Sequence, residues 1–270
     1  QVEVTVYVDD FILIAPPHLE KKIWAALSEQ ITFKDPPEVL SRYLGIYHHF
    51  KTLPDGTIQM ITEAKDYVLD AVKTYMEECK ISSLSWVPSP SIDDKFDVAH
   101  SQPGALAKNA ASHLMKLLYV ARMVRGDFLT TVTFLARRIR YWSVNEDKRL
   151  CRLMAYAYHH CSEALVHELH PKDLERAFLD YSPDAELGGD PYSTKASGGY
   201  WLELSSPCGT RKWPLGWAVK KAGHTSGSTA DSETWSLVGA NDSGLKREGI
   251  AVVAQVEVTL QRAVTRGGTE

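Results

Sequence analysis

The stretch Glu3–Pro17, EVTVYVDDFILIAPP, places two adjacent carboxylates, Asp9 and Asp10, between two runs of apolar and β-branched residues. Two such runs on either side of turn-forming residues predict an antiparallel hairpin, with strands over residues 2–8 and 11–15 and the aspartates at or beside the turn. Arms this apolar predict that the hairpin lies in the core of a sheet. Carboxylates that project from such a hairpin repel each other unless a cation neutralises them.

The carboxylate pair has two interpretations. Hard oxygen ligands favour Mg²⁺ or Mn²⁺, and two-metal phosphoryl transfer uses such ions ~3.5–4 Å apart to stabilise the attacking and leaving oxygens. The alternative is an ordinary hairpin turn, because Asp is common in turns where its side chain bonds to the nearby backbone. The dipeptide by itself leaves both interpretations open.

The composition is that of a soluble globular protein. The chain has 270 residues, of which 44% are hydrophobic and 24% charged, and a net charge of −4, so it can bury one large core or two modest ones. Its apolar runs are far shorter than the ~20 residues of a membrane span, and its first residues show no signal-peptide pattern. The four cysteines are scattered without zinc or redox spacings, so we expect reduced, buried thiols.

The residue pattern predicts an α+β fold in three parts. Residues 1–90 mix strands (4–8, 11–15, 43–50 and 56–62) with helices (18–31 and 63–79). Residues 91–172 continue a connector rich in Pro, Ser and Asp, and then show helical spacing to about Leu169, with helices over 111–124, 128–142 and 145–165. Residues 173–270 return to strands (177–182, 198–204 and 211–221) and then to a helix that Ser228 or Thr229 could cap.

The string Tyr7-Val8-Asp9-Asp10 resembles the YVDD box of reverse transcriptases, and its surroundings resemble the polymerase of copia-type retrotransposons. In that family the box precedes a helix, a KD segment, an LGI strand, a DG.I hairpin and a YI..LL helix. The same order appears here in Lys34-Asp35, Leu44-Gly45-Ile46, Asp55-Gly56-Thr57-Ile58 and Tyr67–Val72. LLYVARMVRGDF is similar to the family's LLYLA..TRPDI, with Gly126 in place of the usual proline.

The C-terminal part resembles the family's ribonuclease H. YSPDAELGGDPYSTKASGGYWLEL is similar to the family's YSDADWAGD and RRSTSGYVF strings, which places Asp184 at the first catalytic Asp. STADSETWSL is similar to SSTEAEYVAL, which places Glu233 at the catalytic Glu. Three departures imply drift of this site: Glu186 replaces the second Asp of DAD, Pro183 is inserted before Asp184, and Thr234 replaces a Tyr.

The resemblance implies a partial reverse transcriptase palm in residues 1–90, a helical thumb or connection module in 91–172, and a C-terminally incomplete ribonuclease H-like mixed sheet with helices in 173–270. It implies RNA-directed DNA polymerase and ribonuclease H activity, with two Mg²⁺ or Mn²⁺ ions per complete site and the metal ligands Asp9, Asp10, Asp184 and Glu233. The implied partners are an RNA/DNA hybrid or template-primer and deoxynucleoside triphosphates, without a membrane, in the cytoplasm, a virus-like particle or the nucleus.

Each site is expected to be incomplete. The family polymerase needs a third carboxylate from an earlier palm strand, and its ribonuclease H needs a further Asp, usually as DN, after the helix. We find neither, and therefore expect a polyprotein fragment that is not competent alone. The alternative is a non-catalytic nucleic-acid-binding remnant of the same fold. An unrelated α+β domain with an accidental YVDD is a third alternative.

A local basic stretch, residues 122–152, stands out in this acidic chain. A basic helical face could follow the phosphates of a template-primer, with Tyr141 and Trp142 as neighbouring aromatic surface. A solvated helix face is the alternative. The residues that we assign to nucleic-acid binding are Arg137, Arg138, Arg140, Lys148 and Arg149.

Overall fold

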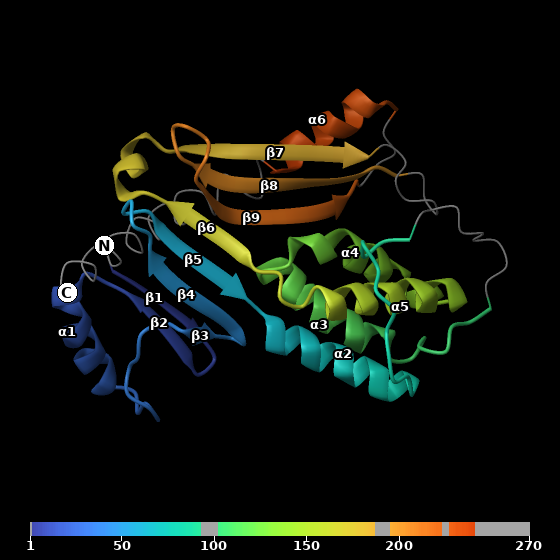
Figure 1. Ribbon diagram of the computed structural model, residues 1–270, viewed down its shortest axis with the longest axis horizontal. Helices are drawn as coiled ribbons and strands as arrows, with labels where there is room; N and C mark the ends of the chain where they lie inside the picture. Colours follow the sequence, from blue (N-terminus) through green and yellow to red (C-terminus); the bar gives the residue numbers. More distant parts are fainter. Residues whose placement is uncertain (1, 93–101, 187–194, 223–226, 241–270) are drawn as a thin grey trace.

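The computed structural model describes residues 2–92, 102–186, 195–222 and 227–240. This part of the chain combines antiparallel sheets with several helices (Figure 1), which agrees with the predicted α+β class. A two-stranded hairpin and a four-stranded sheet lie beside a bundle of helices, and a three-stranded sheet with one helix lies along both. No helix in the described ranges is long and apolar enough to cross a membrane.

The N-terminal hairpin is confirmed. Strands β1 (Glu3–Tyr7) and β2 (Asp10–Ile14) pair antiparallel, with Tyr7 opposite Asp10, and helix α1 (Pro17–Ser28) follows. The expectation that the hairpin lies in a sheet core is wrong, because among the described residues its strands form a sheet of their own. Phe11 packs edge-on against Phe33, so the hairpin is covered on that side, whereas Val6 on β1 is 53% exposed.

The second sheet contains a strand that the sequence did not indicate. Its order is β3 (Arg42–Tyr43), β4 (Ile46–Thr52), β5 (Ile58–Glu63) and β6 (Leu165–Leu169). The predicted helix over 145–165 ends at His159, and the chain then pairs with β5, Val166 lying opposite Ile61. In β6 the buried positions alternate, but one of them is His167, so hydropathy alone does not show the period of a strand.

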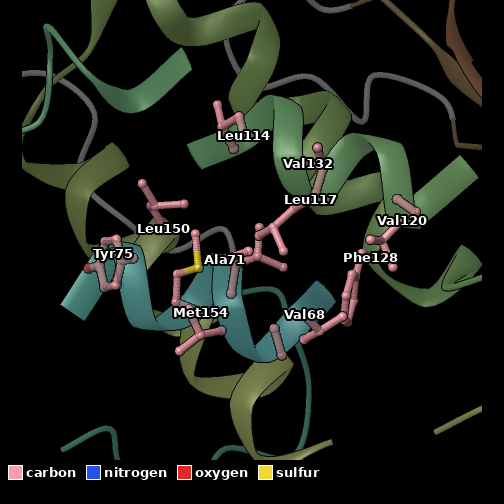
Figure 2. Close-up of a cluster of buried hydrophobic side chains, with 14 of the residues drawn as sticks. Val68, Ala71, Tyr75, Leu114, Leu117, Val120, Phe128, Val132, Leu150 and Met154 are labelled. Atoms are coloured by element: carbon pink, nitrogen blue, oxygen red, sulfur yellow. The ribbon is translucent and has the colours of Figure 1, made fainter. Parts of the chain in front are cut away.

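Four helices form the main core (Figure 2): α2 (Lys65–Cys79), α3 (Ala110–Met123), α4 (Leu129–Arg138) and α5 (Val144–His159). Short 3₁₀ turns, η1 (Gly126–Phe128) and η2 (Ile139–Tyr141), flank α4. Val68 and Tyr75 of α2 belong to the same cluster as Leu114, Leu150 and Met154 of the later helices. Helix α2, which we placed in residues 1–90, therefore shares its core with the helices of residues 91–172.

The C-terminal sheet follows the 3₁₀ helix η3 (Pro171–Arg176). Its order is β7 (Phe178–Glu186), β8 (Ser197–Ser205) and β9 (Lys212–Lys221), and helix α6 (Thr229–Ala240) packs on β7 and β8. The predicted cap is confirmed, because the Ser228 hydroxyl accepts a hydrogen bond from the backbone N–H of Asp231. A small core that includes Leu169 and Trp213 joins this sheet to β5 and β6.

A tryptophan joins the C-terminal sheet to the helix bundle. The indole Nε1 of Trp217 on β9 donates to the Ala121 carbonyl at 2.8 Å. A Cβ at Gly126 would lie only 3.0 Å from the same nitrogen. Gly126, at the position of the proline that is usual in the polymerases the sequence resembles, therefore lies at a close contact between the two parts.

Candidate metal and nucleic-acid sites

The turn that carries the first carboxylate pair has an unfavourable backbone conformation. Val8, the first central residue, has φ 56° and is 85% exposed, whereas Asp9 has no positive φ. A positive φ at the first position alone is typical of a type II′ turn, which favours Gly there. An L-residue in the left-handed region costs ~1–2 kcal/mol. Backbone strain of this kind is concentrated at functional sites, and here it lies beside the aspartates.

Tyrosine side chains lie near the turn. The phenol of Tyr43 on β3 has a raised pKa, mainly because of burial and then because of the negative charge of Asp10. Its hydroxyl oxygen is buried without a hydrogen-bond partner among the described residues. Tyr119 of α3 donates its hydroxyl to the Leu44 carbonyl at 2.6 Å and contacts the Tyr67 ring. The hairpin tip is thus adjacent to an aromatic edge of the second sheet.

The donor chemistry at the tip fits a hard divalent ion. Asp9 and Asp10 are exposed, and none of the hydrogen bonds or ion pairs in the described ranges uses their carboxylates. Carboxylate and water oxygens are the ligands that Mg²⁺ takes in proteins. No group of three or more His, Cys, Asp or Glu side chains that could hold a metal ion occurs among the described residues. Asp9 and Asp10 therefore form a partial ligand set.

The second carboxylate pair comes from two elements that pack together. Asp184 lies on β7 and Glu233 on α6, and α6 packs on β7 and β8. The Ser236 hydroxyl of α6 donates to the backbone carbonyl of Asp184 at 3.0 Å. Both carboxylates are exposed and, among the described residues, unpaired, so their donor chemistry also fits a hard ion. That the Asp184 and Glu233 carboxylates bind one shared ion stays a prediction.

Two of the five predicted nucleic-acid-binding residues stabilise the helix bundle. Arg149 is only 6% exposed, and its guanidinium lies over the Phe134 ring at 5.0 Å. Arg138 pairs with the fully buried Glu146 at 3.3 Å. Burial raises the pKa of Glu146, but hydrogen bonds from Ser143 and the charge of Arg138 outweigh it, so the pKa is lowered overall. Arg149 is thus not part of an exposed face.

The exposed basic surface is smaller than expected. Arg140 and Lys148 are exposed, and Tyr141, which directly follows Arg140, is 69% exposed, with the Arg138 guanidinium 5.5 Å from its ring centre. Arg137 is half-buried and donates to the Ser197 hydroxyl at 3.4 Å. We define Arg140, Tyr141 and Lys148 as the basic-aromatic surface.

The prediction that Trp142 is a surface aromatic is wrong. Its side chain is 5% exposed, and its indole donates to Asp147 at 2.7 Å. Ser143 and Glu146 form a capping box at the start of α5. Trp142 lies directly before this N-cap, and its hydrogen bond to Asp147 holds the indole against the first turn of α5. The S-x-x-E signal could have shown from the sequence where α5 begins, but not that Trp142 is buried.

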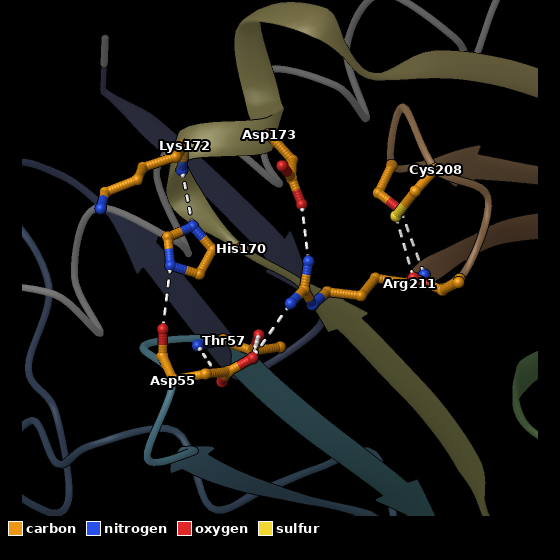
Figure 3. Close-up of polar contacts among 9 residues, drawn as sticks. Asp55, Thr57, His170, Lys172, Asp173, Cys208 and Arg211 are labelled. Atoms are coloured by element: carbon orange, nitrogen blue, oxygen red, sulfur yellow. Dashed lines mark hydrogen bonds and ion pairs between the residues drawn. The ribbon is translucent and has the colours of Figure 1, made fainter.

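A cluster that sequence reasoning missed joins three segments (Figure 3). Arg211, in the β8–β9 turn, pairs with Asp55 of the β4–β5 turn at 3.0 Å and with Asp173 of η3 at 3.1 Å. Nε2 of His170 donates to the Asp55 carbonyl, because its Nδ1 accepts from the Lys172 backbone N–H. These residues are far apart in the sequence, and their charges show no spacing that links them.

The expectation of buried thiols is wrong, most clearly for one cysteine. Cys208 is exposed beside this cluster, in the β8–β9 turn, whereas the other three cysteines are half-buried. Hydrogen bonds from the side chains of Ser206 and Thr210 lower the pKa of its thiol to about 7. All four cysteines are free, as expected.

No model of a known protein family matches this chain. No curated protein matches it either. No solved structure matches its fold. The likeness to copia-type polymerases therefore rests on the quoted motifs and their order, and its functional content is a proposal.

Proposed function

We propose that this chain is a region of a copia-type retrotransposon polyprotein, with reverse transcriptase and ribonuclease H parts that serve two-metal phosphoryl transfer on nucleic acid. The observation that carries the proposal is the strained turn that presents Asp9 and Asp10 at an exposed tip. A type II′ turn with Gly at the Val8 position would form at lower cost, so the valine supports a functional role for the tip.

The order of elements after the helical module also supports the proposal. The resemblance implies a ribonuclease H-like sheet whose first strand carries an Asp and whose following helix carries a Glu. Three antiparallel strands followed by a packed helix, with Asp184 and Glu233 in adjacent elements, agree with that expectation.

The proposed roles follow from the side-chain chemistry. Asp9 with Asp10, and Asp184 with Glu233, would each hold Mg²⁺ or Mn²⁺, which stabilises the charges that develop in phosphoryl transfer. Arg140 and Lys148 of the basic-aromatic surface neutralise phosphates, and Tyr141 offers a ring on which a base can stack. The proposed substrates are an RNA/DNA hybrid or template-primer and deoxynucleoside triphosphates.

A second candidate is a nucleic-acid-binding protein of the same fold without catalysis. The partial ligand sets favour it, because no described group supplies three metal-ligating side chains. Two carboxylates and water bind a divalent ion weakly, and phosphoryl transfer needs both ions held in line with the reacting groups.

Mn²⁺ titration followed by electron paramagnetic resonance tests the proposal. We expect weak binding to the whole chain, part of which is lost in Asp9→Asn/Asp10→Asn and the rest in Asp184→Asn/Glu233→Gln. Glu38→Gln, which removes an exposed carboxylate without an assigned role, is the control. Binding that none of the variants changes would contradict both metal sites.

Primer extension and hybrid cleavage, each with Mg²⁺ and with Mn²⁺, separate the two candidates. We expect the chain alone to bind a hybrid but to extend no primer. Extension that Asp9→Asn abolishes would exclude the binding-only candidate.

A further inference from the structure

Helix α6, which packs on the C-terminal sheet, contains two buried serines. Ser232 is completely buried and Ser236 is 6% exposed, and their spacing of four residues places them on one face of the helix. The Ser232 hydroxyl donates back to the Ser228 carbonyl at 3.2 Å, within the N-terminal turn of the helix. The Ser236 hydroxyl instead donates to the sheet.

The Ser236 hydroxyl bonds to both strands below it. Its oxygen lies 3.0 Å from the Asp184 carbonyl oxygen on β7 and 3.1 Å from the Gly199 carbonyl oxygen on β8. Asp184 and Gly199 are directly opposite each other in the register. A side chain at Gly199 would not fit, because a Cβ would meet the Ala218 carbonyl oxygen at 2.7 Å. One proton shared by two carbonyls thus fixes α6 over one specific residue pair.

That residue pair is the one that carries the predicted metal ligand Asp184. Glu233 precedes Ser236 by three residues, about one turn of α6, so the two are neighbours on the helix surface, with Ser236 buried and Glu233 exposed. We infer that Ser236 is a positioning residue, which holds α6 so that the Glu233 carboxylate lies beside that of Asp184 and both can bind one divalent ion. The inference rests on the proposed function, because it uses the same two carboxylates.

Ser232 provides the matched control. Both serines are buried on the same face of α6, but only the Ser236 hydroxyl reaches the strand that carries Asp184. Replacing either one with alanine removes a buried hydroxyl from one helix, but only Ser236→Ala removes hydrogen bonds that join α6 to β7 and β8. A difference in metal affinity between the folded variants therefore reports on position.

The experiment is a Mn²⁺ titration of the whole chain in an Asp9→Asn/Asp10→Asn background, with circular dichroism to confirm folding. We expect Asp184→Asn and Glu233→Gln each to remove binding, Ser236→Ala to weaken it about 2- to 10-fold, the effect of one hydrogen bond, and Ser232→Ala to leave it unchanged. Ser236→Ala should have no further effect once Glu233 is Gln. Ser236→Thr, which keeps the hydroxyl, should bind like the parent chain.

The opposite outcomes are distinguishable. Loss of binding in Asp184→Asn and Glu233→Gln, with equal affinities for Ser236→Ala, Ser232→Ala and the parent, would overturn the positioning role and leave the metal site standing. Binding that Asp184→Asn and Glu233→Gln do not change would overturn both the inference and the proposed second site. If Ser236→Ala does not fold, Ser236→Cys takes its place, because the thiol is of similar size but a weak donor, and the same weakening is expected.

Discussion

At the scale of single residues, Val8 in the hairpin turn has a backbone conformation that is unfavourable for a β-branched residue. A β-branched residue at φ 56° gains nothing from packing when it is 85% exposed. Burial of the Val8 side chain therefore does not offset the strain of its backbone. The hairpin should become more stable when Val8 is changed to a residue that tolerates a positive φ.

We expect Val8→Gly to raise the free energy of unfolding by about 0.5–1 kcal/mol, since relief of ~1–2 kcal/mol of strain exceeds the entropy that glycine adds to the unfolded chain. Urea denaturation measures this change in the free energy of unfolding. The control is Val6→Gly, at a regular strand position, which should lower stability by roughly 0.5–1 kcal/mol. Loss of stability in Val8→Gly would show that the turn is not strained.

His167 predicts a pH dependence. Burial lowers its pKa to about 4, from an unfolded value of 6.5, so the folded state resists protonation. Stability is complete above pH ~6.5 and decreases as the pH falls toward about 4, by up to about 3 kcal/mol. Among its neighbours, His48 on β4 also has a lowered pKa because of burial. Urea midpoints between pH 7 and 4 should therefore fall less in His167→Gln than in the wild type, and the exposed His18→Gln should follow the wild type.

At the scale of secondary structure, the predictions held wherever local pattern decides the outcome. The hairpin has the predicted position, and α2 and α3 match the predicted helices to within about two residues at each end. Strand β6 was missed because only pairing with β5, more than a hundred residues earlier, gives those five residues a partner. Arg149 and Trp142 were misplaced because burial depends on which helices meet, and single-sequence charge patterns do not contain that information.

The basic-aromatic surface at η2 and the start of α5 predicts how hybrid binding depends on salt. Arg140→Ala/Lys148→Ala should lower the affinity and reduce the slope of log K against log salt by about 0.9 for each phosphate that is no longer neutralised. Tyr141→Leu should lower the affinity with little change of slope, because stacking releases no counterions. Fluorescence anisotropy over a salt series measures both. Lys21→Ala/Lys22→Ala on α1 is the charge-matched control. An equal loss of affinity in this control would show that hybrid binding depends on the total charge of the protein and not on the basic-aromatic surface.

At the scale of the whole molecule, Arg211 joins the β8–β9 turn to the second sheet through Asp55 and to η3 through Asp173. The Thr57 backbone and hydroxyl, and then Arg211, lower the pKa of Asp55 to about 2. A lowered carboxyl pKa contributes stability that is complete above the unfolded value of 3.8 and is lost as the pH falls toward about 2. The contact therefore persists at neutral pH and weakens in acid.

We expect Arg211→Gln to loosen the packing of the C-terminal sheet on the second sheet without unfolding either. Hydrogen exchange should become faster in β6 and β9, which flank the contact, and stay unchanged in α3 and α4. Arg176→Gln, an exposed arginine of η3, is the matched control. If β6 and β9 are equally protected from hydrogen exchange in the wild type and in Arg211→Gln, the small core around Trp213 is enough to hold the C-terminal sheet on the second sheet.

The open side of the N-terminal hairpin has a consequence for handling the protein. Among the described residues β1 pairs with β2 alone, and Val4 and Val6 are partly exposed along it. A flat apolar strand with unpaired amide groups is a template for intermolecular β-aggregation. Light scattering at rising concentration should therefore show association that Val6→Lys, a charged gatekeeper at that edge, suppresses, whereas Val144→Lys, an exposed valine on α5, should not.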